Sequence, residues 1–184
     1  VPPENPGSAI ASGMALIPAD RRRGGALLLV SVAHNVVSAS LAAFSVGGIL
    51  RQGAIARTTN DYVDKLDIRI SDVLQRIGTL SGGNQQKAIL ARGLVTKPKV
   101  LILHEPTRGI DVGAKEEIYA ILAALASEGM AVMMISSELP EIVLHSSRVL
   151  VMERGRVAAT FRGAEITEEA IMQAALGQLA VAAE

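Results

Sequence analysis

The sequence predicts an α/β fold that is built on a parallel β-sheet. Three observations carry this prediction: short apolar runs of strand length, helical apolar spacing between them, and glycine or proline at the boundaries. The apolar runs are Met14–Ile17, Val100–Leu103 and Ala131–Ile135. Strands of a parallel sheet that is covered on both faces are apolar throughout instead of alternating. We therefore expect other elements to cover both faces of this sheet.

The first half of the chain predicts one strand and a group of helices. Residues 1–12 contain Pro, Gly and Ser and are expected to be irregular, and a basic loop is expected at 21–25. The run at 14–18 ends in proline and predicts a buried strand. Helices are expected at 34–44 and 52–66, the second with apolar residues at helical spacing. Ser81 can cap a helix that runs to about Val95, before Lys97-Pro98 stops it.

Strands and helices alternate from Lys99 onward. We expect strands at 100–104, 131–135 and 148–152, and helices from 111–113 to Gly129, at 139–144 and at 167–176. A turn at 153–156 makes 157–161 the hairpin partner of the third strand. The predicted organisation is therefore an N-terminal remnant (1–12), a partial core strand with a helical subdomain (13–98), and an α/β core with a C-terminal hairpin and helix (99–184).

The composition excludes several kinds of function. The chain has 184 residues, which is enough for one domain with a real core. Eighteen basic and 18 acidic residues give no net charge, so no electrostatic footprint for nucleic acid is present. The chain has no cysteine, which rules out disulfides, thiolate metal sites and cysteine nucleophiles.

The uncharged stretch at 24–50 leaves two interpretations open. Its 27 residues carry no formal charge and are long enough to span a bilayer. However, His34, Asn35, four serines and two glycine pairs reduce its hydropathy. We expect a buried helix followed by a loop, with a membrane-spanning helix as the alternative.

The turn Leu80-Ser81-Gly82-Gly83 is a candidate phosphate contact. Small residues let backbone N–H groups approach an anion, and a helix N-terminus favours negative charge. Taken alone, such a turn is more often an ordinary loop and helix cap. The sequence contains no G-x-x-x-x-G-K-S/T loop, and none of its 17 glycines is followed by lysine. The sequence therefore contains one candidate phosphate contact but no phosphate-binding loop of the G-x-x-x-x-G-K-S/T type.

The order of the motifs makes a chance match improbable. After the Ser-Gly-Gly turn come an apolar strand that ends in Glu105-Pro106, a Gly-Ile-Asp string at 109–111, and a second apolar strand. In this order the chain resembles the ATP-binding cassette (ABC) ATPases, with a signature motif, a Walker B segment and a D-loop. The strings at 80–87, 105–115 and 134–141 resemble the C-terminal cassette of the tandem ATPases of ribose-, galactose- and xylose-type sugar importers. The resemblance runs from about residue 13 to residue 176.

The resemblance implies a P-loop NTPase-like cassette with a helical signature subdomain. The family's Walker A strand and helix would lie upstream of Val1. In the family, two cassettes meet head to tail, and the signature of one closes over the ATP that the other holds. The resemblance then assigns nucleotide contacts to Leu80, Ser81, Gly82, Gly83, Asn84 and Asp111. Ser81 would hydrogen-bond the γ-phosphate and Asp111 would cross the interface.

The resemblance places Glu105 in the position of the general base that polarises the attacking water. A plain surface acid after a strand is the alternative interpretation. The preceding position, where the family has the Walker B aspartate, is His104. Mg²⁺ prefers hard oxygen ligands, so we expect Mg²⁺ binding to be weak or absent there. A zinc site of the H-E-x-x-H type is excluded as well, because Arg108 stands where the second histidine is needed.

Two further positions depart from the family pattern. Ser137 stands at the position of the switch histidine, and Ala19 stands where the family has Gln or Glu after the early strand. Phosphoryl transfer depends on positioning and charge neutralisation. We therefore expect no metal site and no ATP hydrolysis by this chain alone.

Two functions remain open at this point. The first is a partial ATP-binding subunit of a sugar importer that supplies the signature half of a composite ATP site. Its partners would be another cassette that carries Walker A, and transmembrane permease subunits. It would lie in the cytoplasm, peripheral on the inner face of the plasma membrane. The second is a degenerate, non-catalytic cassette fragment that acts only as an interaction module.

Overall fold

The computed structural model describes residues 3–178, so the ends of the predicted segments 1–12 and 99–184 lie outside the described residues. The chain divides into two compact units at Ile135/Ser136. The first unit contains α1 (Pro6–Ala11), β1 (Met14–Ile17), α2 (Val32–Val37), β2 (Ser45–Val46), β3 (Ile49–Leu50), α3 (Gln52–Lys65), α4 (Gly82–Val95), β4 (Val100–His104), α5 (Val112–Ser127) and β5 (Ala131–Ile135). The second contains α6 (Leu139–His145), β6 (Arg148–Glu153), β7 (Arg156–Arg162) and α7 (Glu168–Ala175).

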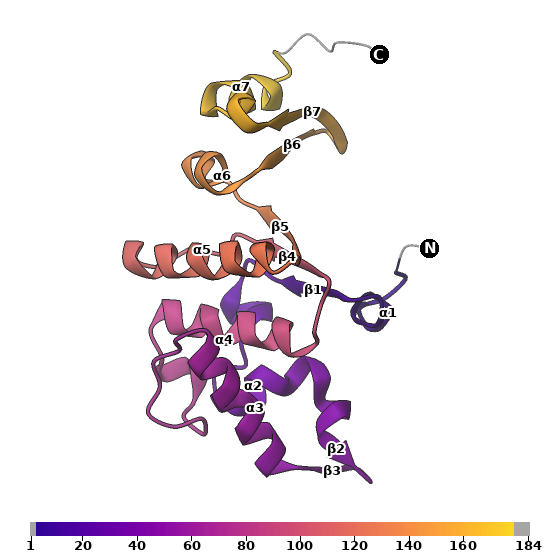
Figure 1. The fold of residues 1–184 in the computed structure, drawn as a ribbon, viewed down its shortest axis with the longest axis vertical. Helices are drawn as coiled ribbons and strands as arrows, with labels where there is room; N and C mark the ends of the chain where they lie inside the picture. Colours follow the sequence, from indigo (N-terminus) through magenta and orange to yellow (C-terminus); the bar gives the residue numbers. More distant parts are fainter. Residues whose placement is uncertain (1–2, 179–184) are drawn as a thin grey trace. The chain divides into compact units, whose positions relative to one another are not determined.

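The core of the first unit is a parallel sheet with the strand order β1-β4-β5 (Figure 1). Met14 pairs with Val100, and Val100 pairs with Ala131. In the central strand β4, Leu101 and Leu103 are fully buried. The predicted α/β fold with a parallel sheet is therefore confirmed.

One detail of the predicted sheet is wrong. We expected both faces to be covered, but along each strand more buried residues alternate with more exposed ones. Ile17 is buried while its neighbour Leu16 is 61% exposed, and in β5 Met133 is 48% exposed. The reason is that the buried side chains belong to the core shared with α4 and α5, whereas the residues between them point to the other face.

The helical part of the first unit breaks the uncharged stretch at 24–50 into short pieces. Helix α2 is followed by a 3-10 segment (Ser38–Phe44), kinked at Ser40, and by the small β2–β3 hairpin. The expected helix at 34–44 is thus shorter, because serine hydroxyls bond to nearby backbone carbonyls there. Within residues 3–178, no helix combines the length and hydropathy that a membrane crossing needs.

The N-terminal segment also differs from the prediction. Residues Pro6–Ala11 form a short helix where an irregular segment was expected. Asn5 caps this helix by accepting a hydrogen bond from the Ser8 N–H, and Pro6 occupies its first position. The local signal was present, since proline is favoured at the first helical position and asparagine at the cap.

The second unit is a two-layer arrangement of its own. Strands β6 and β7 pair antiparallel with Val149 opposite Phe161, which confirms the predicted hairpin. Helix α7 is capped by Thr167, whose hydroxyl accepts from the Ala170 N–H. Val151 and Ile171 are buried in the small core of this unit.

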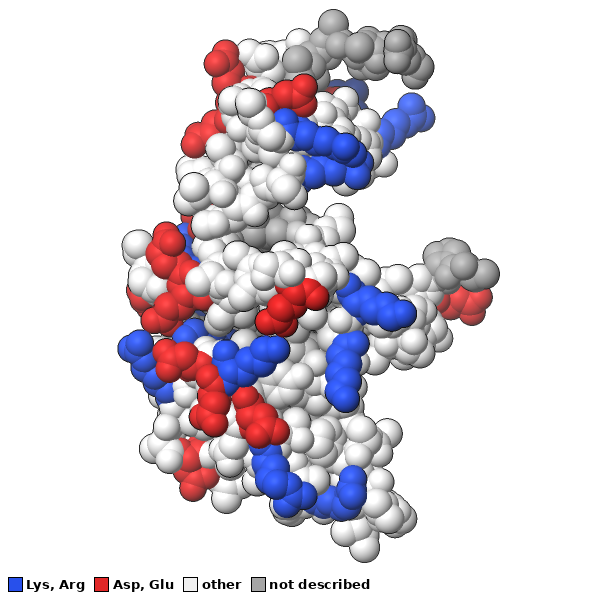
Figure 2. Space-filling view, viewed as in Figure 1, with Lys and Arg blue, Asp and Glu red and all other residues white. Residues whose placement is uncertain are grey.

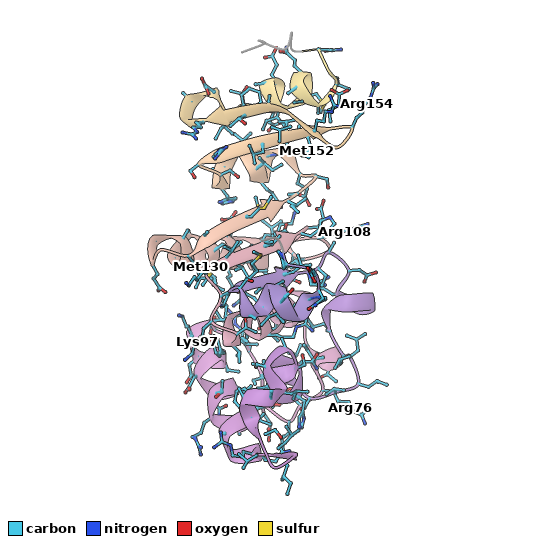
Figure 3. The ribbon with its side chains drawn as sticks, turned by 90° about the vertical axis from the view of Figure 1, so that its right-hand side faces the viewer. Arg76, Lys97, Arg108, Met130, Met152 and Arg154 are labelled. Carbon is cyan, nitrogen blue, oxygen red and sulfur yellow. The ribbon has the colours of Figure 1, made fainter. Side chains whose placement is uncertain are left out.

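Both signs of charge occur on the surface. On the face drawn in Figure 2, the Lys and Arg side chains and the Asp and Glu side chains form small groups that broad uncharged areas separate. Figure 3 labels Arg76 in the loop before α4 and Lys97 just after it. Lys97 has a φ of +52°, the left-handed conformation in which the chain leaves the helix and turns toward β4.

Candidate nucleotide-contact site

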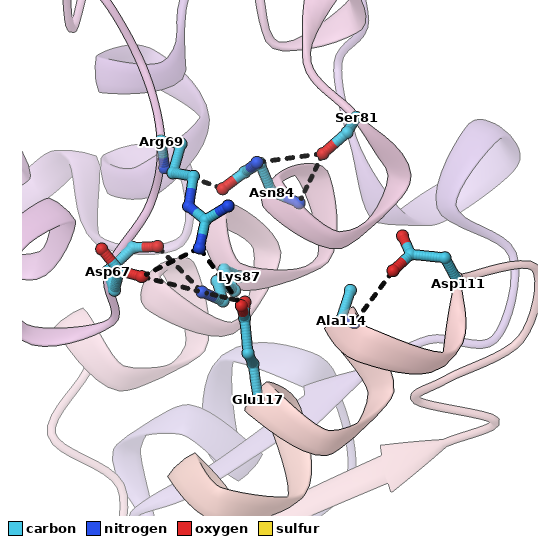
Figure 4. Close-up of polar contacts among 8 residues, drawn as sticks. All are labelled: Asp67, Arg69, Ser81, Asn84, Lys87, Asp111, Ala114 and Glu117. Atoms are coloured by element: carbon cyan, nitrogen blue, oxygen red, sulfur yellow. Dashed lines mark hydrogen bonds and ion pairs between the residues drawn. The ribbon is translucent and has the colours of Figure 1, made fainter.

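Ser81 caps helix α4 as predicted, and its hydroxyl is at the surface. Its Oγ accepts from the Asn84 backbone N–H at 3.4 Å and from the Asn84 side-chain Nδ2 at 2.9 Å (Figure 4). Leu80, directly before it, is buried and anchors the turn in the core. The start of α4 is therefore a fixed turn in which the residue that carries the hydroxyl, Ser81, is exposed.

Asn84 connects this turn to the preceding loop. Its Oδ1 accepts from the Arg69 backbone N–H at 2.7 Å. Ser81 and Asn84 also line a shallow hollow together with Arg69, Gln75 and Thr79. Both ends of the Asn84 amide are thus used within the protein.

Gly83 is required by close packing between two helices. A Cβ at this position would lie 2.5 Å from the Cβ of Ala114 in α5, which is much closer than van der Waals contact. Glycine therefore lets the first turn of α4 approach the first turn of α5. This brings the Ser81 turn next to the turn that contains Asp111.

Asp111 caps helix α5. Its Oδ1 accepts from the Ala114 N–H at 3.0 Å, and its side chain is exposed (Figure 4). An aspartate at a helix cap is favoured both by this hydrogen bond and by the helix dipole. The structure thus places the starts of α4 and α5, and with them Ser81 and Asp111, on one region of the first unit.

Arg21 holds these two turns together. Its Nη1 donates to the Gly82 carbonyl at 3.0 Å, and its Nη2 donates to the Gly109 carbonyl at 2.9 Å. The planar guanidinium suits this role because it presents several donors in a fixed geometry. The sequence predicted only a basic loop at 21–25, but Arg21–Gly25 forms a π-helical turn, and this contact was missed. The string Ile17-Pro18-Ala19-Asp20-Arg21, which resembles the family's string after the early strand, was the available signal.

Glu105 follows β4 in a strained conformation. Its φ of +50° is unusual for a residue with a side chain, and its backbone N–H donates to the Ile135 carbonyl at 2.7 Å. Strain of this kind is often kept where a side chain must be aimed. The half-buried Glu105 side chain therefore remains the candidate general base.

The donors next to Glu105 do not fit Mg²⁺. His104 is exposed at the end of β4, and a single imidazole is a poor substitute for a carboxylate oxygen at a Mg²⁺ site. Among residues 3–178, no group of three or more His, Cys, Asp or Glu side chains is arranged to hold a metal. Two other positions were expected to depart from the family pattern. Ala19 is half-buried just after β1, and Ser137 belongs to the second unit.

A charged cluster lies one turn behind the Ser81 turn, and no pattern in the sequence predicted it. Lys87 is buried in α4 and contacts Glu117 of α5 and the loop residue Asp67, with Arg69 close by (Figure 4). The hydrogen bond and the charge of Lys87 lower the pKa of Glu117 below its ordinary value of 4.5. The cluster therefore ties the signature helix to α5.

The fold is that of an ATP-binding cassette. A nucleotide-free cassette from an ABC transporter superposes with a TM-score of 0.75 and 19% identity, over 97% of this chain and 70% of that chain. A dimeric cassette in a post-hydrolysis state, bound to ADP and Pi, superposes with a TM-score of 0.69 and 17% identity, over 86% of this chain and 67% of that chain.

Sequence comparison places the chain among the same proteins. The family model described as ABC transporter matches residues 26–108. The ribose import ATP-binding protein RbsA 2 of Streptomyces avermitilis is 46% identical over 95% of this chain and 35% of its own length. The xylose import ATP-binding protein XylG of Moorella thermoacetica is 49% identical over 95% of this chain and 34% of its own length. The chain belongs to the ABC transporter family of ATP-binding proteins, and it spans about a third of the length of these relatives.

Proposed function

We propose that the chain supplies the signature half of a composite ATP site in the ATP-binding subunit of a sugar-import ABC transporter. The observation that carries this proposal is the Arg21 fork between the Gly82 and Gly109 carbonyls. It holds two exposed helix starts side by side, one with Ser81 and one with Asp111. A rigid pair of this kind is suited to contact a ligand that another surface presents.

The Ser81 turn has the chemistry to receive a terminal phosphate. The hydroxyl of Ser81 can donate a hydrogen bond, and the backbone N–H groups of Gly82 and Gly83 have no acceptor within the helix. The missing side chains of Gly82 and Gly83 leave room for Arg21 and Ala114, which keeps this turn close to the start of α5. The positive end of the α4 dipole adds to the attraction.

Asp111 and Glu105 complete the proposed assignment. Asp111 would contact the partner cassette across the interface, from the start of α5. Glu105 holds the general-base position, but the absence of a suitable Mg²⁺ ligand at His104 makes its own half-site inactive. Hydrolysis would then take place only at a site whose Walker A loop the partner provides.

The substrate and partners follow from the relatives. The names of the two relatives describe ribose and xylose import. We propose that this chain acts in the import of a sugar of this class, together with transmembrane permease subunits. One structural neighbour, with a TM-score of 0.70, is described as part of the ABC transporter complex cbiONQ. The chain would work at the cytoplasmic face of the membrane.

The test is ATP-dependent association with an intact cassette, for which the Moorella xylose import protein is a suitable partner. Association should need ATP and should be lost in Ser81→Arg, because the added side chain occupies the phosphate position. Ser127→Arg, an exposed serine at the other end of α5, is the matched control and should associate normally. Association that is independent of ATP and insensitive to Ser81→Arg would instead support the interaction-module function.

A further inference from the structure

We propose that Asn84 is a positioning residue that makes the Ser81 hydroxyl a hydrogen-bond donor, and so selects an acceptor-only phosphate oxygen as its ligand. This inference rests on the proposed function, since it assumes that Ser81 meets a phosphate. It changes the expected role of Asn84 from a direct nucleotide contact to the control of hydrogen-bond direction at its neighbour.

The direction of the Asn84 amide is fixed by the backbone. The Arg69 N–H can only donate, so the amide atom 2.7 Å from it must be the oxygen Oδ1. The other end of the amide is then the NH₂ group, which can also only donate. It lies 2.9 Å from Ser81 Oγ, so the hydroxyl oxygen of Ser81 accepts this hydrogen bond.

The Ser81 hydroxyl is left with one available hydrogen-bonding group, its donor proton. A hydroxyl has two acceptor lone pairs and one donor proton. The oxygen accepts from the Asn84 Nδ2 and, in the helix cap, from the Asn84 backbone N–H. Within residues 3–178, no acceptor receives the Ser81 proton, so this proton is available to a ligand. The oxygens of a fully ionised phosphate only accept, so they match it.

Three serines at the C-terminal ends of helices use their hydroxyl protons within the chain. Ser12, Ser38 and Ser127 each donate their hydroxyl proton to a backbone carbonyl three or four residues earlier, at 2.7–2.8 Å. Such bonds use up the proton that a phosphate needs. At Ser81 the amide of Asn84 supplies a donor, so the hydroxyl acts as the acceptor in this contact.

Asn84→Asp is the central variant of the test. The carboxylate can still accept from the Arg69 N–H, and an acid in the first turn of α4 is favoured by the helix dipole, so the fold is kept. However, the carboxylate cannot donate to Ser81, so the hydroxyl proton turns toward residue 84. Asn84→Ala removes the amide without adding charge. Gln85→Glu is the charge control, because it adds the same charge one residue later. It also removes the hydrogen bond from the Gln85 amide to the Leu80 carbonyl, so Gln85→Met, which removes that bond without adding charge, is measured beside it.

The first measurement needs no nucleotide. Amide hydrogen exchange of Arg69, followed by NMR on the isolated chain, reports whether Asn84 holds its N–H. Exchange should be slow in the natural chain and in Asn84→Asp, and at least several-fold faster in Asn84→Ala. Equal exchange in all three would overturn the inference, whatever the outcome with ATP.

The second measurement is ATP-dependent association with the intact Moorella cassette. We expect Asn84→Ala to weaken it roughly five-fold, the equivalent of one hydrogen bond, and Asn84→Asp to weaken it at least as much as Ser81→Ala. Relative to Gln85→Met, Gln85→Glu should change it less than two-fold at 0.5 M salt, where exposed charges are screened. Equal losses in Asn84→Asp and Gln85→Glu would show a charge effect and overturn the inference. Failure of the natural chain to associate would instead overturn the proposed function.

Discussion

Lys87 Nζ lies 2.8 Å from Glu117 Oε2, and this ion pair joins the buried middle of α4 to α5. The Lys87 side chain is only 3% exposed, whereas that of Glu117 is 42% exposed. Lys87 Nζ also donates to the Asp67 carbonyl at 2.8 Å. A buried ammonium needs such partners, because an unpaired buried charge is strongly unfavourable.

Substitution of Glu117 and substitution of Lys87 should lower the free energy of unfolding by different amounts. Glu117→Gln leaves the buried Lys87 charge with fewer partners and should lower the free energy of unfolding by about 1–3 kcal/mol. Lys87→Met removes the charge and keeps an apolar chain of similar length, so its loss should be smaller. The double variant should resemble Lys87→Met. Urea unfolding of the four proteins gives the comparison, and an additive double variant would contradict the coupling.

The same pair predicts a pH dependence. Lys87 lowers the pKa of Glu117 below 4.5 in the folded state. A lowered carboxyl pKa contributes stability that is present above the unfolded-state pKa and is lost as the pH falls through the folded-state pKa. The natural chain should therefore lose more stability than Glu117→Gln when the pH is reduced below 4.5. Parallel stability curves for the two proteins over this range would refute the assignment.

The local elements of the site could be predicted from the sequence, because their signals are local. Ser81 before a helical run predicts the cap of α4, and the apolar run at 100–104 predicts β4. Asp111 likewise stands directly before the apolar pattern of α5. In each case the residues that form the element are adjacent in the chain, so spacing and capping chemistry are sufficient.

The contacts that join these elements could not be predicted in this way. Arg21 reaches carbonyls that are 61 and 88 residues away along the chain. Asn84 meets the backbone of Arg69, and Lys87 meets Glu117, across different elements. No periodicity in the sequence marks these pairs. The sheet prediction was incomplete for a similar reason, since apolar β-strand composition does not say which face a helix covers.

Gly83 should be intolerant of even one methyl group. A Cβ there would lie 2.5 Å from the Ala114 Cβ, so Gly83→Ala should lower the free energy of unfolding by about 1–3 kcal/mol. Gly53→Ala in α3 is the matched control: its Cβ would meet only the end of the Arg57 side chain, and it should be neutral or slightly stabilising.

Replacing Ala114 with glycine should restore the space between α4 and α5 that Gly83→Ala fills. The pair Gly83→Ala with Ala114→Gly should regain most of the loss, less the roughly 1 kcal/mol that a helical glycine costs. Thermal or urea unfolding measures both effects. If Ala114→Gly leaves the Gly83→Ala defect unchanged, the contact between α4 and α5 is not its cause.

Arg21→Lys should loosen the two turns of the candidate site. A lysine has a single ammonium in place of the fork and cannot span both the Gly82 and Gly109 carbonyls. We expect a loss of about 1–2 kcal/mol in stability and faster amide exchange in the turns that contain Ser81 and Asp111. Arg76→Lys, at an exposed loop position (Figure 3), should change neither quantity. Unchanged exchange in both turns would show that Arg21 does not hold them.

Glu105 should be a position where glycine is tolerated better than usual. With a φ of +50°, the natural residue carries backbone strain that glycine does not have, so Glu105→Gly relieves about 1 kcal/mol or more. This gain offsets the entropy that glycine loses on folding, and the free energy of unfolding should stay the same or rise slightly. Glu105→Gln keeps the strain and removes only the charge, so a change in its stability measures what the carboxylate itself contributes.

The matched control for this prediction is Glu116→Gly, an exposed glutamate inside helix α5. There the backbone is unstrained, so glycine should lower the free energy of unfolding by about 1 kcal/mol. Urea unfolding of Glu105→Gly, Glu105→Gln and Glu116→Gly separates the cases. Equal losses in the two glycine variants would mean that the turn after β4 stores no strain. A tolerated Glu105→Gly would show that the natural residue is strained at the end of β4.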